Sequence, residues 1–180
     1  VNPHKNINLY PFEYEGFLDH QIDSPFPEKI YLRELIETGQ TISDEKVLEK
    51  LKPPPIKVID LLETARFNIA YALAAVLSHR HGDLATAKTE FTKSCLFGIR
   101  SLIILSLKKF PTTYQEIFTL SSSLELEGEY REIIQHAFEV RHGANIEEAK
   151  LYKNISLLNK VVRRKIFSVL DEKGDIVVLG

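Results

Sequence analysis

The sequence feature that most constrains the fold is the stretch Ala87–Phe110, AKTEFTKSCLFGIRSLIILSLKKF. Apolar residues recur in it at helical spacing, at positions 91, 95, 99, 102 and 103, and further apolar side chains widen this stripe around most of the circumference. A helix that is apolar nearly all round is buried. Its small residues allow neighbouring helices to approach closely: Ser94, Gly98, Ser101 and Ser106. The stretch therefore predicts the central helix of a helical bundle.

Composition agrees with a single substantial core. The chain has 180 residues, of which 44% are hydrophobic and 27% charged, as in ordinary globular domains. A formal net charge of −2 argues against a globally basic nucleic-acid binder and still permits a local basic patch. The central stretch is too short for a bilayer span and carries Arg100, so we expect no membrane insertion. Without a signal peptide a cytoplasmic location is expected. The sequence begins at Val1 and contains no methionine, so we expect a start codon to be missing, which leaves an upstream domain open.

The N-terminal part is expected to be an arm. Residues 1–27 are rich in turn formers, with one short strand predicted at Asn6–Phe12. Helices are predicted at Glu28–Thr38 and Asp44–Leu51, the second capped by Ser43. The triplet at positions 53–55 is three consecutive prolines, which is stiff and extended, so we place a domain boundary there.

The rest of the chain predicts an all-α fold: an antiparallel up-and-down bundle of four main helices plus a short one, with a small N-terminal α/β or irregular segment. The expected domains are an arm at 1–52, a bundle at 56–171 and a tail at 172–180. The tail is predicted to be a turn followed by a strand. We expect this strand to pair with Asn6–Phe12 or with a sheet outside this chain. The expected helices of the bundle are 56–81, 87–110, 114–122, 125–142 and 147–170.

Three side chains have simple structural interpretations. Cys95 lies in the apolar helix, which favours a core position over a reactive thiolate. His79 and His81 end the first long helix, and positions two residues apart point in different directions, so they make a poor chelate. We expect no metal site.

Two groups of residues can carry chemistry. Arg131 and His136 are candidates for RNA hydrolysis, in which histidine moves a proton and arginine stabilises phosphorane charge. Five residues advance a helix by about 500°, so the two side chains do not share a face, and solvated surface positions are the simpler interpretation. A basic stripe on the last helix can meet phosphates or can be a solvated helix end: Lys160, Arg163, Arg164 and Lys165.

Residues 56–170 resemble the HEPN family, the helical domain that accompanies prokaryotic nucleotidyltransferases. The likeness rests on LLETARFNIAYALAA and on FTKSCLFGIRSLIILSLKKFPTTYQEI, which looks like the family's small-residue, cysteine-containing helix followed by a loop and a short helix. The segment EVRHGANIEEAK is similar to the family's Arg-x-x-Ala-Asp-Tyr stretch. Arg141 and Ala144 match that stretch, whereas Asn145 and Ile146 replace Asp and Tyr.

The N-terminal part resembles the closing segment of a minimal nucleotidyltransferase. Arg33, Glu34 and Leu35 match the family's Arg-Glu-Ile helix, Gly39 matches its glycine, and Asn8 stands about where the last catalytic aspartate falls. The family's glycine-serine motif and its paired aspartates are absent from this sequence. The chain alone is therefore not expected to transfer nucleotides.

The resemblance implies a non-catalytic HEPN-like module for nucleotide or substrate binding and for dimerisation, with Arg141, His142 and Asn145 as substrate-binding residues. The expected partners are a second copy, a nucleotidyltransferase domain or protein, and a nucleotide or RNA, with no cofactor. One alternative is a toxin-type HEPN RNA endonuclease with a composite site at a homodimer interface. Arg131 and His136 have the spacing of its signature, although Glu132 replaces the usual polar Asn, Asp or His. A structural protein–protein adapter is the second alternative.

Overall fold

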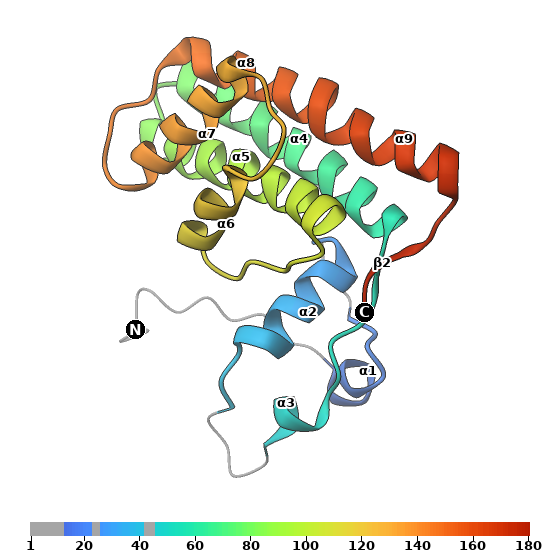
Figure 1. The fold of residues 1–180 in the computed structure, drawn as a ribbon. Coiled ribbons are helices and arrows are strands. Elements are labelled where there is room, and N and C mark those ends of the chain that lie inside the picture. The colour runs from blue at the N-terminus through green and yellow to red at the C-terminus, as the bar shows by residue number, and fades with distance from the viewer. Residues whose placement is uncertain (1–12, 23–25, 42–45) are drawn as a thin grey trace, which may run out of the picture.

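The computed structural model describes residues 13–22, 26–41 and 46–180. The predicted strand at Asn6–Phe12 and the predicted cap at Ser43 lie outside these residues. The structure confirms an all-α bundle, in which successive long helices are joined by short loops and run antiparallel (Figure 1). None of the helices in the described part of the chain combines the length and apolar character needed to cross a bilayer. The bundle consists of α4 (Val58–Arg80), α5 (Leu84–Leu107), the short α6 (Tyr114–Ser121), α7 (Gly128–Arg141) and a last long helix made of α8 (Glu148–Ser156), η1 (Leu157–Arg163) and α9 (Arg164–Lys173).

Helix α5 is the centre of the bundle, as its sequence predicts. It contacts α4, α6, α7 and the last helix, and Cys95 is fully buried in it. This burial confirms its predicted core position and raises the pKa of the thiol, which disfavours the reactive thiolate. Helix α5 ends at Leu107 rather than Phe110, because Pro111 disfavours helical backbone in the residue before it and Lys108 takes a left-handed conformation with φ 54°.

The small residues of α5 let the last helix approach closely. A Cβ atom added at Gly98 would collide with the side chain of Leu158. One turn earlier, the Ser94 hydroxyl accepts a hydrogen bond of 2.9 Å from the Asn154 side-chain amide, and both residues are buried. The predicted role of the small residues is confirmed at these two positions.

The last helix differs from the regular helix predicted at 147–170, because η1 is a π-helix. Four of its six buried residues, Asn154, Leu158, Val162 and Ile166, recur every four positions. Four residues advance an α-helix by about 400°, so a strict repeat of four drifts by about 40° at each step. The wider π-helical turn takes up this drift and keeps the buried stripe directed at α4 and α5.

The C-terminal strand pairs with a partner that the sequence did not indicate. Strand β2 (Val177–Leu179) is antiparallel to β1 (Ile56–Lys57), the two residues after the prolines. The predicted partner Asn6–Phe12 lies outside the described residues. The Asp175 carboxylate accepts a hydrogen bond from the Ile59 backbone N–H and forms an ion pair with Lys57 at 3.7 Å. The tail pairs there because β1 and the first turn of α4 offer it both free backbone groups and a cation.

Helices α1 (Tyr14–Leu18), α2 (Glu28–Thr38) and α3 (Val47–Lys50) lie together at one end of the bundle (Figure 1). Helix α2 has the predicted bounds, whereas α3 is shorter than predicted. Ile30 of α2 joins the core of the bundle. The Arg33 guanidinium donates hydrogen bonds to the carbonyls of Pro54 at 3.1 Å and Gly180 at 3.0 Å. Helix α2 is thus fastened to the bundle across the proline triplet.

Candidate ligand-binding site

Arg131, the first residue of the candidate ribonuclease pair, binds its own chain. Its guanidinium donates to the carbonyls of Leu126 at 3.1 Å, Leu124 at 2.9 Å and Ser122 at 3.3 Å. These bonds hold the segment before α7 in a non-helical conformation, which explains why α7 begins at Gly128 and not at the predicted Glu125. The side chain organises a loop.

His136 is buried, with 6% of its surface exposed, so the prediction of a solvated position is wrong. Its Nε2 accepts a hydrogen bond of 3.1 Å from the Glu147 backbone N–H, and its ring lies 5.7 Å from that of Phe91. The carboxylates of Glu139 and Glu147 are 3.9 Å and 3.7 Å from Nδ1. His136 therefore connects α7 to the loop that follows it, and its contacts share no residue with those of Arg131.

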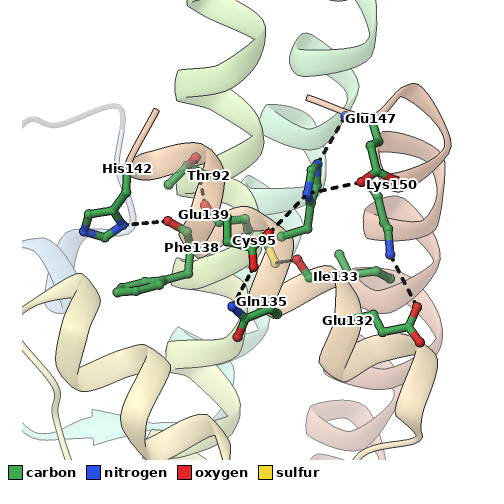
Figure 2. Close-up of polar contacts among 12 residues, drawn as sticks. Thr92, Cys95, Glu132, Ile133, Gln135, Phe138, Glu139, His142, Glu147 and Lys150 are labelled. Atoms are coloured by element: carbon green, nitrogen blue, oxygen red, sulfur yellow. Dashed lines mark hydrogen bonds and ion pairs between the residues drawn. The ribbon is translucent and has the colours of Figure 1, made fainter. Parts of the chain in front are cut away.

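The three predicted substrate-binding residues separate into two groups. The His142 ring contacts the Phe138 carbonyl at 2.8 Å, on the side of α7 away from Glu147 and Lys150 (Figure 2). Arg141 instead lines a small pocket, and Asn145 accepts a hydrogen bond of 3.4 Å from Lys88, which lines the same pocket. Arg141 therefore lines the pocket, Asn145 contacts it only through Lys88, and His142 lies outside it.

We call this hollow the cationic pocket. Its volume is about 90 Å³, and it lies between the first half of α5, Tyr114 of α6 and the end of α7. Its wall contains three cations and no acidic residue. None of the three cations has an ion-pair partner within the part of the chain that the structure describes. Its lining residues are Lys88, Thr89, Thr92, Lys93, Tyr114, Val140 and Arg141.

A second hollow, the aromatic pocket, adjoins the first and shares Lys93 with it. It lies between α2, α4 and α5 and has a volume of about 160 Å³. Lys93 extends over the ring of Tyr71, with Nζ 6.0 Å from the ring centre. Buried Asn68 adds an amide to the wall, and its nitrogen donates to the Thr64 carbonyl at 2.9 Å. The rings in its wall are those of Phe26, Tyr31, Phe67, Tyr71 and Phe97.

A buried ion pair closes one end of the aromatic pocket. Arg100 is only 4% exposed, and its guanidinium donates to the Glu34 carboxylate of α2 at 2.7 Å. The guanidinium also lies 4.5 Å from the Phe97 ring centre and 5.3 Å from that of Phe110. The Arg100 Nε is buried without a hydrogen-bond partner among the described residues. A buried N–H without a hydrogen-bond partner lowers the free energy of unfolding.

The wall between the two pockets is a stack of two rings. Phe97 lines the aromatic pocket and Tyr114 the cationic pocket, and their rings stack with centres 5.4 Å apart. On the cationic side the Arg141 guanidinium lies 5.1 Å from the Tyr114 ring centre. Burial raises the pKa of Tyr114 although Arg141 opposes the rise, so its phenol stays protonated and can donate a hydrogen bond at neutral pH.

Sequence reasoning found only part of this site. Arg141 and Asn145 came from the family resemblance, and Arg33–Glu34–Leu35 drew attention to α2, but Lys93, Phe97 and Arg100 were seen only as parts of a buried helix. A usable signal exists in the sequence: Lys93 and Arg100 are cations within the mostly apolar stretch 91–107 of this helix, and seven residues apart they lie on one face. A charge in such a place needs a partner or lines a cavity.

The described residues hold no group of three or more His, Cys, Asp or Glu side chains that is arranged to bind a metal ion.

Comparison of the chain with protein-family models, with curated proteins and with solved structures found no match in any of the three. Functional inference therefore rests on the geometry of the two pockets.

Proposed function

We propose that this chain is a non-catalytic, HEPN-like helical module that binds a nucleotide, with the base in the aromatic pocket and the phosphate in the cationic pocket. The observation that carries the proposal is the junction at Lys93. A ring-sized aromatic hollow and an acid-free hollow with three cations share this one residue. A nucleotide has the same two parts, a flat aromatic ring and an anion, at a fixed short separation.

The aromatic pocket matches one ring in size and chemistry. Its volume of about 160 Å³ is close to that of an apolar protein cavity of about 150 Å³ that accommodates benzene. Stacked and edge-on contacts with the surrounding rings favour a planar aromatic guest. These features favour a single-ring base, a pyrimidine, over a purine.

The cationic pocket matches a phosphate group. Lys88, Lys93 and Arg141 provide charge, and the hydroxyl of Tyr114 provides a donor. Charge-assisted hydrogen bonds from such groups to phosphate are roughly twice as strong as neutral ones. No carboxylate lines this wall, so none lies in direct contact with an anion bound there.

The two alternatives receive less support. A ribonuclease needs an arginine and a histidine that face one substrate, but Arg131 binds backbone carbonyls and His136 binds the Glu147 backbone. A purely structural adapter would leave the two pockets without a use. Self-association and docking to a nucleotidyltransferase belong to the proposal through the family resemblance. Two exposed apolar side chains one turn apart on α4, Leu73 and Leu77, offer a surface for such a contact.

The test is isothermal titration calorimetry with uridine monophosphate, uridine and inorganic phosphate. We expect the nucleotide to bind and each fragment to bind at least tenfold more weakly, because each fills one pocket only. Lys93→Met and Arg141→Met should each weaken nucleotide binding about tenfold, the loss of one charge-assisted hydrogen bond. Exposed Lys52→Met is the matched control and should bind as the parent does. Equal affinity for uridine and its monophosphate, or no binding of either, would overturn the proposal.

A further inference from the structure

A third hollow lies apart from both pockets and shares no lining residue with them. It is a groove of about 460 Å³ between α5, the loop before α7 and the junction of η1 with α9. We propose that this basic groove binds an acidic peptide segment that carries leucine-like side chains. Three cations form its rim: Lys160, Arg164 and Lys165. The inference is independent of the proposed nucleotide site.

The cations of the groove are available to a partner. All three are exposed, and none forms an ion pair within the described part of the chain. The lysines of the preceding helix behave differently. Lys150 and Lys153 pair with Glu132 and Glu129 of α7 at 3.4 Å and 3.9 Å. The cations of α8 are therefore neutralised by carboxylates of α7, whereas the cations beside the groove are not. Glu125 is the one acidic residue that lines the groove.

The floor of the groove is apolar. Leu102 of α5 and Leu124 of the loop are almost fully buried, and Leu126 and Val161 are half-buried. An apolar floor with a cationic rim can bind a segment that presents apolar side chains inward and carboxylates outward.

Arg131 gives the groove a fixed wall. Its hydrogen bonds to Ser122, Leu124 and Leu126 span the loop whose residues line the groove. Three bonds from one rigid guanidinium fix the loop before any partner arrives, and a preformed site loses less conformational entropy on binding. Arg131 therefore fixes the loop that forms one wall of the groove.

The lining favours a peptide over a nucleic acid. Proteins that bind single strands combine cations with aromatic side chains on which bases stack. The groove has no aromatic side chain among the residues that line it, and leucine and valine occupy its floor instead. Its volume also exceeds what a single phosphate ion would fill.

The experiment measures fluorescence anisotropy of three labelled nonapeptides: EELEELLEE, KKLKKLLKK and EEGEEGGEE. A labelled uridine nonanucleotide serves as the competing class. The variant Lys160→Glu/Arg164→Glu reverses two charges of the rim. The matched control is Arg163→Glu/Lys52→Glu, which changes the net charge equally with one substitution on the same helix and none in the groove. Circular dichroism confirms that both variants are folded.

We expect EELEELLEE to bind at least tenfold more tightly than either other peptide and than the RNA. The rim variant should weaken this binding at least tenfold, and the control variant should change it less than twofold. Tighter binding of the RNA, equal loss in both variants, or no binding of EELEELLEE would each overturn the proposal.

Discussion

Two faces of helix α5 differ in how completely their neighbours fill the space beside them. Toward the last helix, Ser94 and Gly98 are small, the Leu158 side chain fills the space that they leave, and Asn154 hydrogen-bonds across the contact. Toward α2 and α6, the same helix presents Lys93, Phe97 and Arg100, and two hollows remain open. The first face is close-packed around Ser94 and Gly98, and the second carries charges, an unpaired N–H and unfilled volume.

This difference suggests that the close-packed face mainly stabilises the fold and that the open face is the place for a ligand. Close packing stabilises a fold because every buried atom has a neighbour within van der Waals contact. A hollow lined by a buried charge lacks part of these contacts. A ligand can supply them, and ligand sites are typically such apolar hollows with a few polar groups. Changes to the close-packed face should therefore affect unfolding most, and changes to the open face should affect it less.

The largest effect is expected from Gly98→Val. The new side chain would overlap Leu158, and overpacking of this kind lowers the free energy of unfolding by about 2–3 kcal/mol. Urea denaturation measures the change. Gly128→Val is the control, because no atom lies within 4 Å of a Cβ there. Equal losses at both positions would show that the two helices do not pack as described.

A smaller effect is expected from Arg100→Met, which leaves Glu34 without its cation. Removing one partner of a fully buried pair costs roughly 3–5 kcal/mol. The Glu34 side chain is 31% exposed and regains water, so we expect about 1–2 kcal/mol. In a double-mutant cycle with Glu34→Gln the two changes should couple by about 1 kcal/mol, and strict additivity would contradict the ion pair.

The smallest effect concerns Glu90, one turn before Lys93 on the open face. Burial raises the pKa of the Glu90 carboxyl, and the Lys93 ammonium partly offsets the rise. The native state then holds this proton more tightly than the unfolded chain does. Its contribution to stability is fully present below the ordinary pKa of 4.5 and is lost as the pH rises through the raised native value.

Glu90→Gln removes this dependence, so the melting temperature of the variant relative to the parent should rise between about pH 4 and pH 7. The change should be small because water screens this group. Exposed Glu63→Gln on α4 is the control and should show a smaller rise over the same range. A relative melting temperature that falls with pH would show that the carboxyl is stabilised as an anion.

Local patterns in the sequence determined the helices of this protein. The bounds of α2, the buried circumference of α5 and the small residues that face the last helix all follow from side chains three to eight positions apart, because helical periodicity is a local property. The core position of Cys95 follows in the same way, because Cys95 lies on the apolar face of α5 and that face is buried.

Only the tertiary structure decided the pockets, the π-helix and the pairing of the tail. Glu34 and Arg100 are 66 residues apart, and β1 meets a strand at the other end of the chain. No local pattern specifies such partners, and a hollow forms only where side chains from several helices fail to fill the space between them. The sequence by itself therefore determined the helices and the buried faces of the central one, and the tertiary structure decided where that burial is incomplete.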